Sequence, residues 1–391
     1  MKLRSLTLLL LAQVGALSLW FISSAILPAI LLESEISNFR QAALSSGVQA
    51  GFVIGAVISA ILGLADRYDP RRLFAICAIS AGIVNLALLV TPPGSALAIS
   101  ARIWTGILLA GVYPVGMKIA VGWGEKDRGL LVGALVGALT LGSAVPHLFV
   151  FMGGANWRVV VAVASVTAML SGLICLATAL GPYHSKASQF NPKSVLQAWT
   201  NRRVRLAYLG YLGHMWELYA MWAWVAAIAL ASYSATRTAT DAQSLATLTA
   251  FVAISTGAPL CLAAGFLADR FGKENVAMAS MFLSATFAIL AAVTFGGPVW
   301  LSFIILVAWG MAIIPDSALF SALVADAAPP EYTGSLMTLQ TALGFALTFV
   351  TVQAAPTLAA LVGWPVVLVI LALGPMVGIK AMLSLRRLNQ R

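Results

Sequence analysis

The sequence predicts an all-α membrane protein whose twelve transmembrane helices form two pseudo-symmetric six-helix bundles. Three observations predict this fold class. Hydrophobic residues make up 61% of the 391 residues and charged residues only 9%, which is too apolar for a soluble globule. The apolar runs are long enough to cross a bilayer as helices and lack the short alternation of β-barrel strands. A short charged segment also occurs twice, about half a chain apart.

At about 20 residues per crossing, the apolar runs give twelve spans. They are residues 6–32, 42–64, 72–91, 97–121, 129–152, 158–180, 205–233, 242–267, 274–295, 298–324, 333–356 and 363–384. With a cytoplasmic N-terminus, 17 of the 23 Lys and Arg residues fall on the cytoplasmic side and three on the other. Because basic loops stay in the cytoplasm, we expect both termini there and a bacterial inner membrane as the location.

A polar stretch divides the chain into two halves of six spans. The expected domains are residues 1–180, a cytoplasmic loop at 181–204, and residues 205–391. The halves share a Trp-Gly feature, with Gly106 in the first and Gly310 in the second. Parallel repeats of six spans place a cavity between the halves, as in rocking transporters. This organisation points to transport.

The duplicated segment has Asp66 and Arg67 in its first copy and Asp269 and Arg270 in its second. Residues 265–273 resemble the loop motif of the major facilitator superfamily, and the resemblance covers the whole chain. In the family motif a glycine stands four residues before the aspartate, as Gly265 does before Asp269. The first copy departs from this pattern, because Gly63 stands only three residues before Asp66.

In that family the loop is a conformational latch, so the resemblance implies latch charges. The candidates are Asp66 with Arg67 or Arg128, and Asp269 with Arg270. A carboxylate there can bind a neighbouring helix N-terminus and a nearby arginine. The alternative is that these are solvated loop charges that only set topology.

Few ionisable residues fall within the spans, where each costs about 2.5–3.5 kcal/mol or more and normally faces a cavity or a partner. Arg102 and Gly106 resemble the helix-four motif of the family, which implies a role in proton coupling. The alternatives are an interhelical ion pair or a side chain that extends to the interface. Lys118 is expected to reach the cytoplasmic interface.

His214 and Glu217 are three residues apart and therefore share one helix face, where they can hydrogen-bond directly. Histidine titrates near neutrality, so the pair can take up and release a proton. Asp316 follows Pro315, which breaks the helix and frees a backbone carbonyl. We expect Asp316 to be a second proton carrier. The alternative is a purely structural pair.

The aromatic residues of the seventh span exceed what an interface belt needs. Trp216, Tyr219 and Trp222 are candidates for an aromatic wall around an organic solute, and Tyr113 and His147 are further cavity candidates. The alternative for each is packing within the bundle.

Two other features carry less chemistry. Cys77, Cys175 and Cys261 lie in apolar spans without metal-ligand spacing, so we expect no metal site and no cofactor. Small residues at Gly133 and Gly137 indicate close helix packing. The span also resembles the helix-five antiporter motif of drug exporters, but it lacks the Gly-Pro pair of that motif. We therefore do not infer efflux from it.

The predicted function is secondary active transport of a small solute, coupled to protons, by rocking of the two halves about a central site. The alternatives are a small-anion porter for nitrate, nitrite or cyanate-like ions, and a drug or metabolite efflux antiporter. A membrane enzyme, sensor or scaffold is less well supported, because no nucleophile or metal-ligand set is present. The expected partners are a small-molecule substrate, protons and the lipid bilayer, with no nucleic acid, and the expected state is a monomer.

Overall fold

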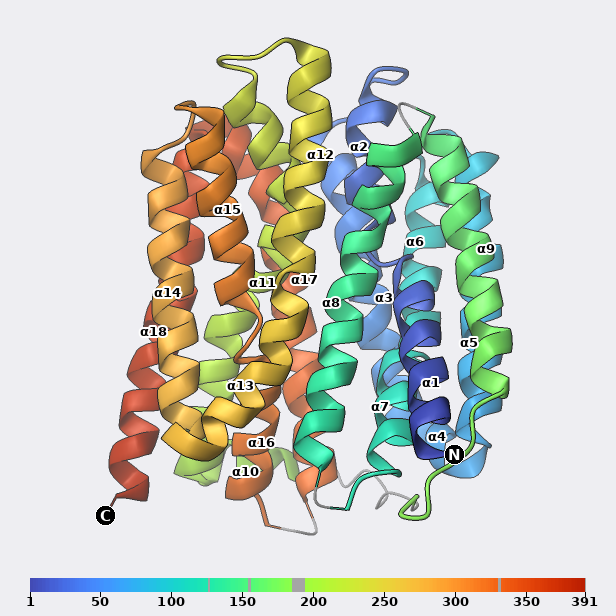
Figure 1. Ribbon diagram of the computed structural model, residues 1–391, viewed down its shortest axis with the longest axis vertical. Helices are drawn as coiled ribbons and strands as arrows, with labels where there is room; N and C mark the ends of the chain where they lie inside the picture. Colours follow the sequence, from blue (N-terminus) through green and yellow to red (C-terminus); the bar gives the residue numbers. More distant parts are fainter. Residues whose placement is uncertain (126, 154–155, 185–193, 330–331, 391) are drawn as a thin grey trace.

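The computed structural model describes residues 1–390 apart from 126, 154–155, 185–193 and 330–331. In this part of the chain all regular structure is helical, and twelve segments are long and apolar enough to cross a membrane. The helices run along the long axis of the molecule, and the first begins at the same end at which the last finishes (Figure 1). We call this end the terminal face and the other end the opposite face.

Six crossings form the first half. Their helices are α1 (Lys2–Leu17), α2 (Ile22–Leu31), α3 (Asn38–Leu62), α4 (Leu64–Arg67), α5 (Pro70–Asn85), η1 (Leu86–Leu89), α6 (Ala96–Leu109), α7 (Tyr113–Val121), α8 (Arg128–Gly153) and α9 (Trp157–Leu176). The pairs α1 and α2, α5 and η1, and α6 and α7 each make one crossing. The single-turn helix α4 holds the first Asp-Arg pair at the terminal face (Figure 1).

Six further crossings form the second half. Their helices, with one short helix before them, are α10 (Ser194–Thr200), α11 (Arg202–Tyr233), α12 (Ala239–Ser255), α13 (Gly257–Phe271), α14 (Lys273–Val293), α15 (Val299–Ile313), α16 (Ser317–Ala327), α17 (Thr333–Val362) and α18 (Trp364–Asn389). The pairs α12 and α13, and α15 and α16, each make one crossing. Helix α10 lies in the stretch predicted as a loop, so that stretch is partly helical.

The predicted number and order of spans are confirmed, and most ends agree to within a few residues. The eleventh span differs most, because α17 continues through Pro356 to Val362 instead of ending at the proline. Proline is tolerated inside membrane helices, where neighbouring groups satisfy the backbone carbonyl that it frees. The twelfth span also continues to Asn389, beyond the predicted end at residue 384.

Each half packs mainly on itself, and the halves meet along two seams. Within the halves, α3 packs on α6, α5 on α9, and α18 on both α11 and α14. Between them, α3 packs on α17, and α8 packs on α12 and α13 (Figure 1). A Cβ atom at Gly133 or Gly137 of α8 would lie 3.1 Å from a backbone oxygen of α13. The predicted close packing through these glycines is confirmed, and it lies on a seam between the halves.

Candidate functional site

Several crossings are interrupted near the middle of the molecule. The first crossing breaks between Leu17 and Ile22, the fourth between Leu109 and Tyr113, and the tenth between Ile313 and Ser317. Broken membrane helices leave backbone groups for other partners and mark binding sites in transporters. The breaks therefore locate the candidate site near the middle of the bundle.

The break in the tenth crossing lies at Pro315, as predicted, and sets Asp316 at the start of α16. Asp316 Oδ1 lies 3.0 Å from His214 Nδ1 on the neighbouring helix α11, and both side chains are buried. His214 also packs near the rings of Tyr211 and Phe320. Among the hydrogen bonds of the described residues, none involves His214 Nε2 or Asp316 Oδ1. The His214 Nδ1–Asp316 Oδ1 contact is therefore at ion-pair distance but is not a hydrogen bond. His214 Nε2 and Asp316 Oδ1 remain available for other partners.

Glu217 is buried one turn along α11 from His214, yet its partners differ from the predicted one. Its Oε1 accepts a hydrogen bond from Trp309 Nε1 at 2.7 Å, and its Oε2 accepts one from Ser284 Oγ at 2.6 Å. The prediction of a direct hydrogen bond between His214 and Glu217 is therefore wrong. The packing of neighbouring helices explains the difference. Helices α14 and α15 each offer Glu217 a hydrogen-bond donor, and the break at Pro315 brings Asp316 to His214. Glu217 therefore lies one turn along α11 from the contact between His214 and Asp316.

Arg102 is fully buried and binds only neutral acceptors in the described residues. Its Nη1 donates to Asn85 Oδ1 at 2.7 Å, and its Nη2 donates to the carbonyls of Leu19 and Trp20 at 2.7 and 2.9 Å. Its Nε donates to the Leu44 carbonyl at 3.4 Å. Arg102 thus satisfies the carbonyls freed by the break between α1 and α2. It does not reach the interface, and no carboxylate of the described residues pairs with it.

A central aromatic cluster fills the middle of the seam between the halves. Its members are Trp20, Phe21 and Phe52 from the first half and Tyr219, Trp222 and Phe345 from the second. Ring centroids lie 4.5 Å apart for Phe52 and Phe345, and 5.8 Å apart for Trp20 and Tyr219. All six side chains are buried. Two predicted cavity residues, Tyr219 and Trp222, therefore lie where the halves meet.

The other predicted cavity residues are dispersed. Trp216 packs against α18, where its Nε1 donates to the Ile370 carbonyl at 3.0 Å, and its place in a cavity wall stays a prediction. The face of α11 that carries Trp216 is covered by α18 of the same half. His147 is buried on α8, and neither of its ring nitrogens has a hydrogen-bond partner among the described residues. Tyr113 lines a cavity between the halves at the terminal face.

Two cavities lie between the halves on either side of the central aromatic cluster. The terminal-face cavity has a volume of about 410 Å³ and is lined by residues that include Ser59, Asp66, Tyr113 and Met337. The opposite-face cavity has a volume of about 390 Å³. Its lining includes Leu27, Asn38, Gln41, Ala227, Pro356 and Trp364.

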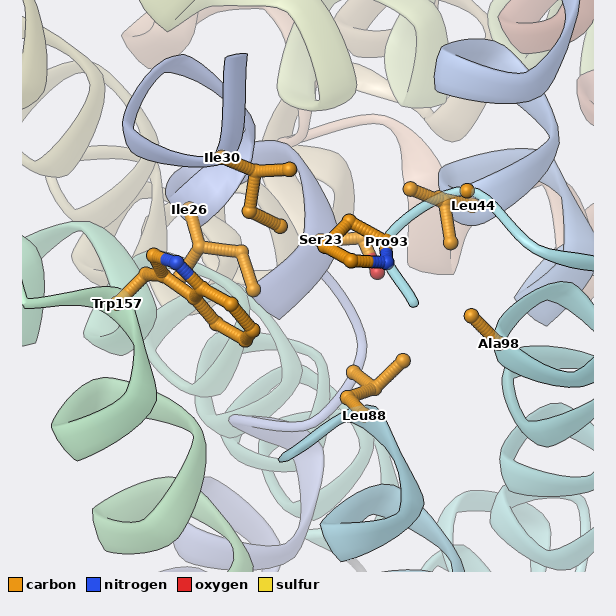
Figure 2. A pocket seen from close by; sticks show the side chains of 9 residues that line it. Ser23, Ile26, Ile30, Leu44, Leu88, Pro93, Ala98 and Trp157 are labelled. Atoms are coloured by element: carbon orange, nitrogen blue, oxygen red, sulfur yellow. The ribbon is translucent and has the colours of Figure 1, made fainter. Parts of the chain in front are cut away.

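A third cavity is too small for a solute. It is lined by Ser23, Ile26, Leu88 and Trp157 among others and has a volume of about 10 Å³ (Figure 2). Such a volume holds at most about one water molecule. It plays no part in the candidate site.

The first latch candidate, Asp66, forms an ion pair with Lys118 of α7. Lys118 Nζ also donates to the Ala65 carbonyl at 2.7 Å. Lys118 is partly exposed and thus lies beside the first Asp-Arg turn at the terminal face. Arg128 Nε donates to the Gly124 carbonyl at 3.1 Å, and the pairing of Asp66 with Arg67 or Arg128 stays a prediction. The turn at α4 directs Asp66 toward α7.

The second latch candidate is arranged differently. Asp269 and Arg270 are exposed at the end of α13, and the Arg270 guanidinium lies 5.4 Å from the ring centroid of Phe271. Gly272 ends the helix with a φ of 86°, and the next residue, Lys273, pairs with Asp326 at 2.5 Å. Both copies lie at the terminal face (Figure 1). The latch role of either copy stays a prediction.

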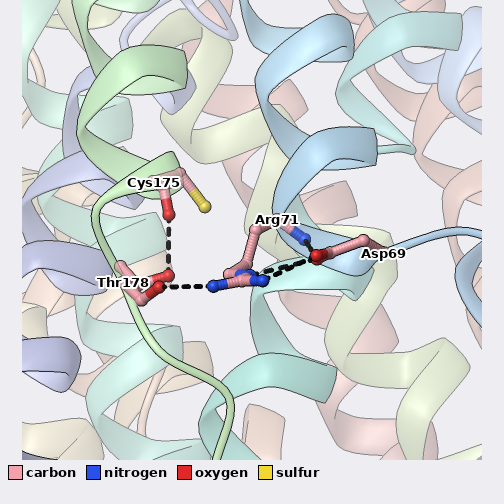
Figure 3. A network of polar contacts seen from close by, with 4 residues as sticks. All are labelled: Asp69, Arg71, Cys175 and Thr178. Atoms are coloured by element: carbon pink, nitrogen blue, oxygen red, sulfur yellow. Dashed lines mark hydrogen bonds and ion pairs between the residues drawn. The ribbon is translucent and has the colours of Figure 1, made fainter.

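A polar network next to the first copy fixes the start of α5 (Figure 3). Asp69 accepts a hydrogen bond from the backbone of Arg71 at 2.9 Å and from its guanidinium at 2.7 Å. Arg71 Nη1 also donates to the Thr178 carbonyl just after α9, at 3.1 Å. The Arg71 guanidinium holds the pKa of the Asp69 carboxyl below its usual range. Asp69 stands three residues after Asp66, where the second copy of the motif has Gly272 three residues after Asp269, and it caps α5.

Sequence reasoning missed several residues of this site. Trp309 belongs to the repeated Trp-Gly feature, but that pattern does not indicate that its indole binds Glu217. Ser284 and Asn85 gave no signal, because a single polar residue in an apolar span does not reveal which helix it faces. The aromatic residues Trp20 and Phe21 lie at a break that no proline or glycine marks.

Comparisons with known proteins agree with this geometry. The model of the Major Facilitator Superfamily matches residues 9–351 of the chain. The crystal structure of a mutant of the nucleoside transporter NupG has a TM-score of 0.71 and 15% identity, over 98% of this chain and 99% of that chain. The crystal structure of a D-xylose-proton symporter has a TM-score of 0.72 and 14% identity, over 96% of each chain. At such identities the likeness shows the fold. No curated protein sequence matches the chain.

Proposed function

The chain belongs to the major facilitator superfamily, and on that premise we propose that it moves a small organic solute in exchange for, or together with, protons. It is an integral membrane protein and a secondary transporter. In the proposed cycle the two six-helix halves rock about the central aromatic cluster. Each of the two cavities between the halves then becomes the entrance in turn.

The observation that carries the proton coupling is the buried group formed by His214, Glu217 and Asp316. Among the described residues, Glu217 receives hydrogen bonds from two neutral donors, Ser284 and Trp309, and no cation is bonded to it to balance a charge. Charge at membrane depth is costly, and binding a proton removes it. His214 and Asp316 are in contact, with 3.0 Å between Nδ1 and Oδ1. A D-xylose-proton symporter with the same fold adds support.

We place the solute between the halves, at the central aromatic cluster. Tyr219 and Trp222 supply flat apolar rings, and the indole Nε1 of Trp222 has no hydrogen-bond partner among the described residues. Ligand pockets combine such apolar walls with a few polar groups that fix orientation. The terminal-face cavity reaches Tyr113 and leads toward this cluster.

The terminal face is proposed to be cytoplasmic. Basic residues concentrate in the loops predicted for that side, which favours cytoplasmic loops. Lys2, Arg71 and Lys273 are described examples at the helix starts of this face.

A small inorganic anion is a weaker candidate substrate. The cations that could hold it inside the bundle are already engaged, with Arg102 on four acceptors and Lys118 on Asp66. Releasing Arg102 would leave buried carbonyls without donors, which is costly, and releasing Lys118 would break its ion pair with Asp66. Efflux by antiport would use the same site, and the direction of the proton gradient that drives transport distinguishes it from uptake.

The proposal is tested in two stages. A thermal-shift screen of the purified protein against sugars, nucleosides, amines, carboxylates and drugs selects a solute that raises the melting temperature. Proteoliposomes with an imposed proton gradient then measure accumulation of that solute. Accumulation that dissipates with a protonophore supports the proposal, and accumulation that is unaffected by it contradicts proton coupling.

Glu217→Gln is expected to abolish gradient-driven accumulation while solute counterflow continues. Glutamine keeps the size of the side chain but cannot release a proton, so the coupling fails and the rocking motion remains. The matched control is Glu274→Gln, a partly exposed residue whose Oε1 binds Asn389. Equal loss of accumulation and counterflow in Glu217→Gln would assign the residue a structural or solute-binding role instead.

A further inference from the structure

One side chain of α17 spans the seam between the halves near the opposite face. Gln353 Oε1 accepts a hydrogen bond from Ser46 Oγ at 2.6 Å, and Gln353 Nε2 donates to the Phe39 carbonyl at 3.0 Å. Ser46 and Phe39 both belong to α3 of the first half. Phe39 is the second residue of that helix, which places this contact toward the opposite face. Both polar ends of one amide thus bind the other half.

The same two helices are arranged differently toward the terminal face. Phe52 of α3 and Phe345 of α17 touch within the central aromatic cluster, at 4.5 Å between ring centroids. Beyond the cluster, Ser59 of α3 and Met337 of α17 line the terminal-face cavity instead of binding each other. The seam is therefore hydrogen-bonded on one side of the cluster and separated by a cavity on the other. The opposite-face cavity borders the bonded side, through Asn38, Gln41 and Pro356.

We propose that Gln353 is a positioning residue that holds the opposite face closed, and that its two hydrogen bonds break and re-form in each transport cycle. The proposal rests on the rocking motion of the proposed function. Neutral hydrogen bonds suit such a contact, because each shifts the equilibrium between the closed and the open opposite face by a factor of only about three to ten. Solute binding can offset a bias of that size.

The test measures which face is open by cysteine labelling, and it needs no solute. Ser59→Cys reports on the terminal-face cavity, and Ala227→Cys on α11 reports on the opposite-face cavity. Each reporter is labelled in nanodiscs with a water-soluble methanethiosulfonate reagent. The protein without a reporter gives the background rate of its own cysteines, of which Cys175 and Cys261 are buried.

Gln353→Leu removes both hydrogen bonds with little change in size, and Ser46→Ala removes one. In Gln353→Leu the opposite-face reporter is expected to label roughly tenfold faster and the terminal-face reporter more slowly. Ser46→Ala should give a smaller change of the same sign, and the double variant should match Gln353→Leu because both act on one contact. The control is Thr351→Val on the same helix, since Thr351 Oγ1 binds only the Thr348 carbonyl of α17 among the described residues.

Unchanged labelling, or a rise at both reporters, would overturn the proposal, because the first denies a closing role and the second indicates general loosening. This outcome is separate from the test of proton coupling. A protein that labels as expected but accumulates no solute under a proton gradient would contradict the proposed coupling and leave the role of Gln353 intact. A protein that accumulates solute while Gln353→Leu labels normally would do the reverse.

Discussion

Arg102 and Glu217 are both ionisable and buried in the spans, but the structure surrounds them in different ways. Arg102 donates to four oxygens that include two carbonyls freed by the break between α1 and α2. Glu217 has two neutral donors among the described residues and lies one turn along α11 from His214, which contacts the acid Asp316. The planar fork of arginine suits several fixed acceptors, whereas a carboxyl group can change its charge by binding a proton. The first residue therefore holds structure, and the second is the better candidate for proton coupling.

Arg102→Lys is expected to lower the free energy of unfolding by roughly 2–4 kcal/mol, because lysine cannot reach four acceptors and leaves buried carbonyls without donors. Thermal unfolding in detergent measures the change. Arg158→Lys is the control, since the exposed Arg158–Glu33 pair contributes about 0–1 kcal/mol. If Arg102→Lys melted like the parent protein yet lost proton-driven accumulation, a direct role in coupling would replace the structural one.

At the scale of the helix, the start of α5 shows how a residue that departs from a motif gains another role. Asp69 stands where the motif has glycine, and it caps α5 while its carboxylate binds Arg71. Arg71 in turn reaches the end of α9, so one side chain connects two helix ends at the terminal face (Figure 3). The contact ties neighbouring helices of the first half together, which suits a half that moves as one body.

This contact predicts a pH dependence of stability. Because the pKa of Asp69 is lowered in the folded protein, its charge stabilises the fold above the unfolded pKa of about 3.9, and that stabilisation is lost as the pH falls through the folded pKa. Asp69→Asn keeps a capping side chain but loses the charge. We expect the variant to be less stable than the parent at pH 7, by about 1 kcal/mol or less, and the difference in thermal unfolding to shrink below about pH 4.

Arg71→Gln is the control for this pH dependence. Without the guanidinium, Asp69→Asn should make little further difference to the melting temperature at pH 7. A difference between the parent protein and Asp69→Asn that stays constant from about pH 7 to about pH 3 would show that capping, and not charge, is responsible.

For the whole molecule, the two Asp-Arg turns lie on the same face, yet their surroundings are unlike. Asp66 lines the terminal-face cavity and pairs with Lys118. Asp269 is exposed at the end of α13. Gly334 and Ser335 at the start of α17 line the same cavity as Asp66, so its negative charge faces a cavity that a helix N-terminus of the other half also lines, a favourable arrangement. The two latch candidates are therefore not equivalent.

Asp66→Asn is expected to raise the labelling rate of Ser59→Cys in the terminal-face cavity several-fold, because the neutral amide holds Lys118 and the α17 start less strongly. Asp269→Asn is the matched variant from the second copy, and it should change the rate less. The measurement is the methanethiosulfonate labelling rate in nanodiscs. Equal effects of the two variants would restore the symmetric latch that the duplicated motif implies.

The sequence by itself determined the membrane class, the twelve spans, the shared face of the two Asp-Arg turns and the break at Pro315. Hydropathy, basic loops and proline act locally, so they can be read along a chain. Only the tertiary structure decided the partners of the polar groups: Asp316 for His214, Ser284 and Trp309 for Glu217 and freed carbonyls for Arg102, all buried, and Lys118 for the partly exposed Asp66. In an apolar span any helix can face any other, and the hydrogen bonds form only after packing has chosen the neighbours.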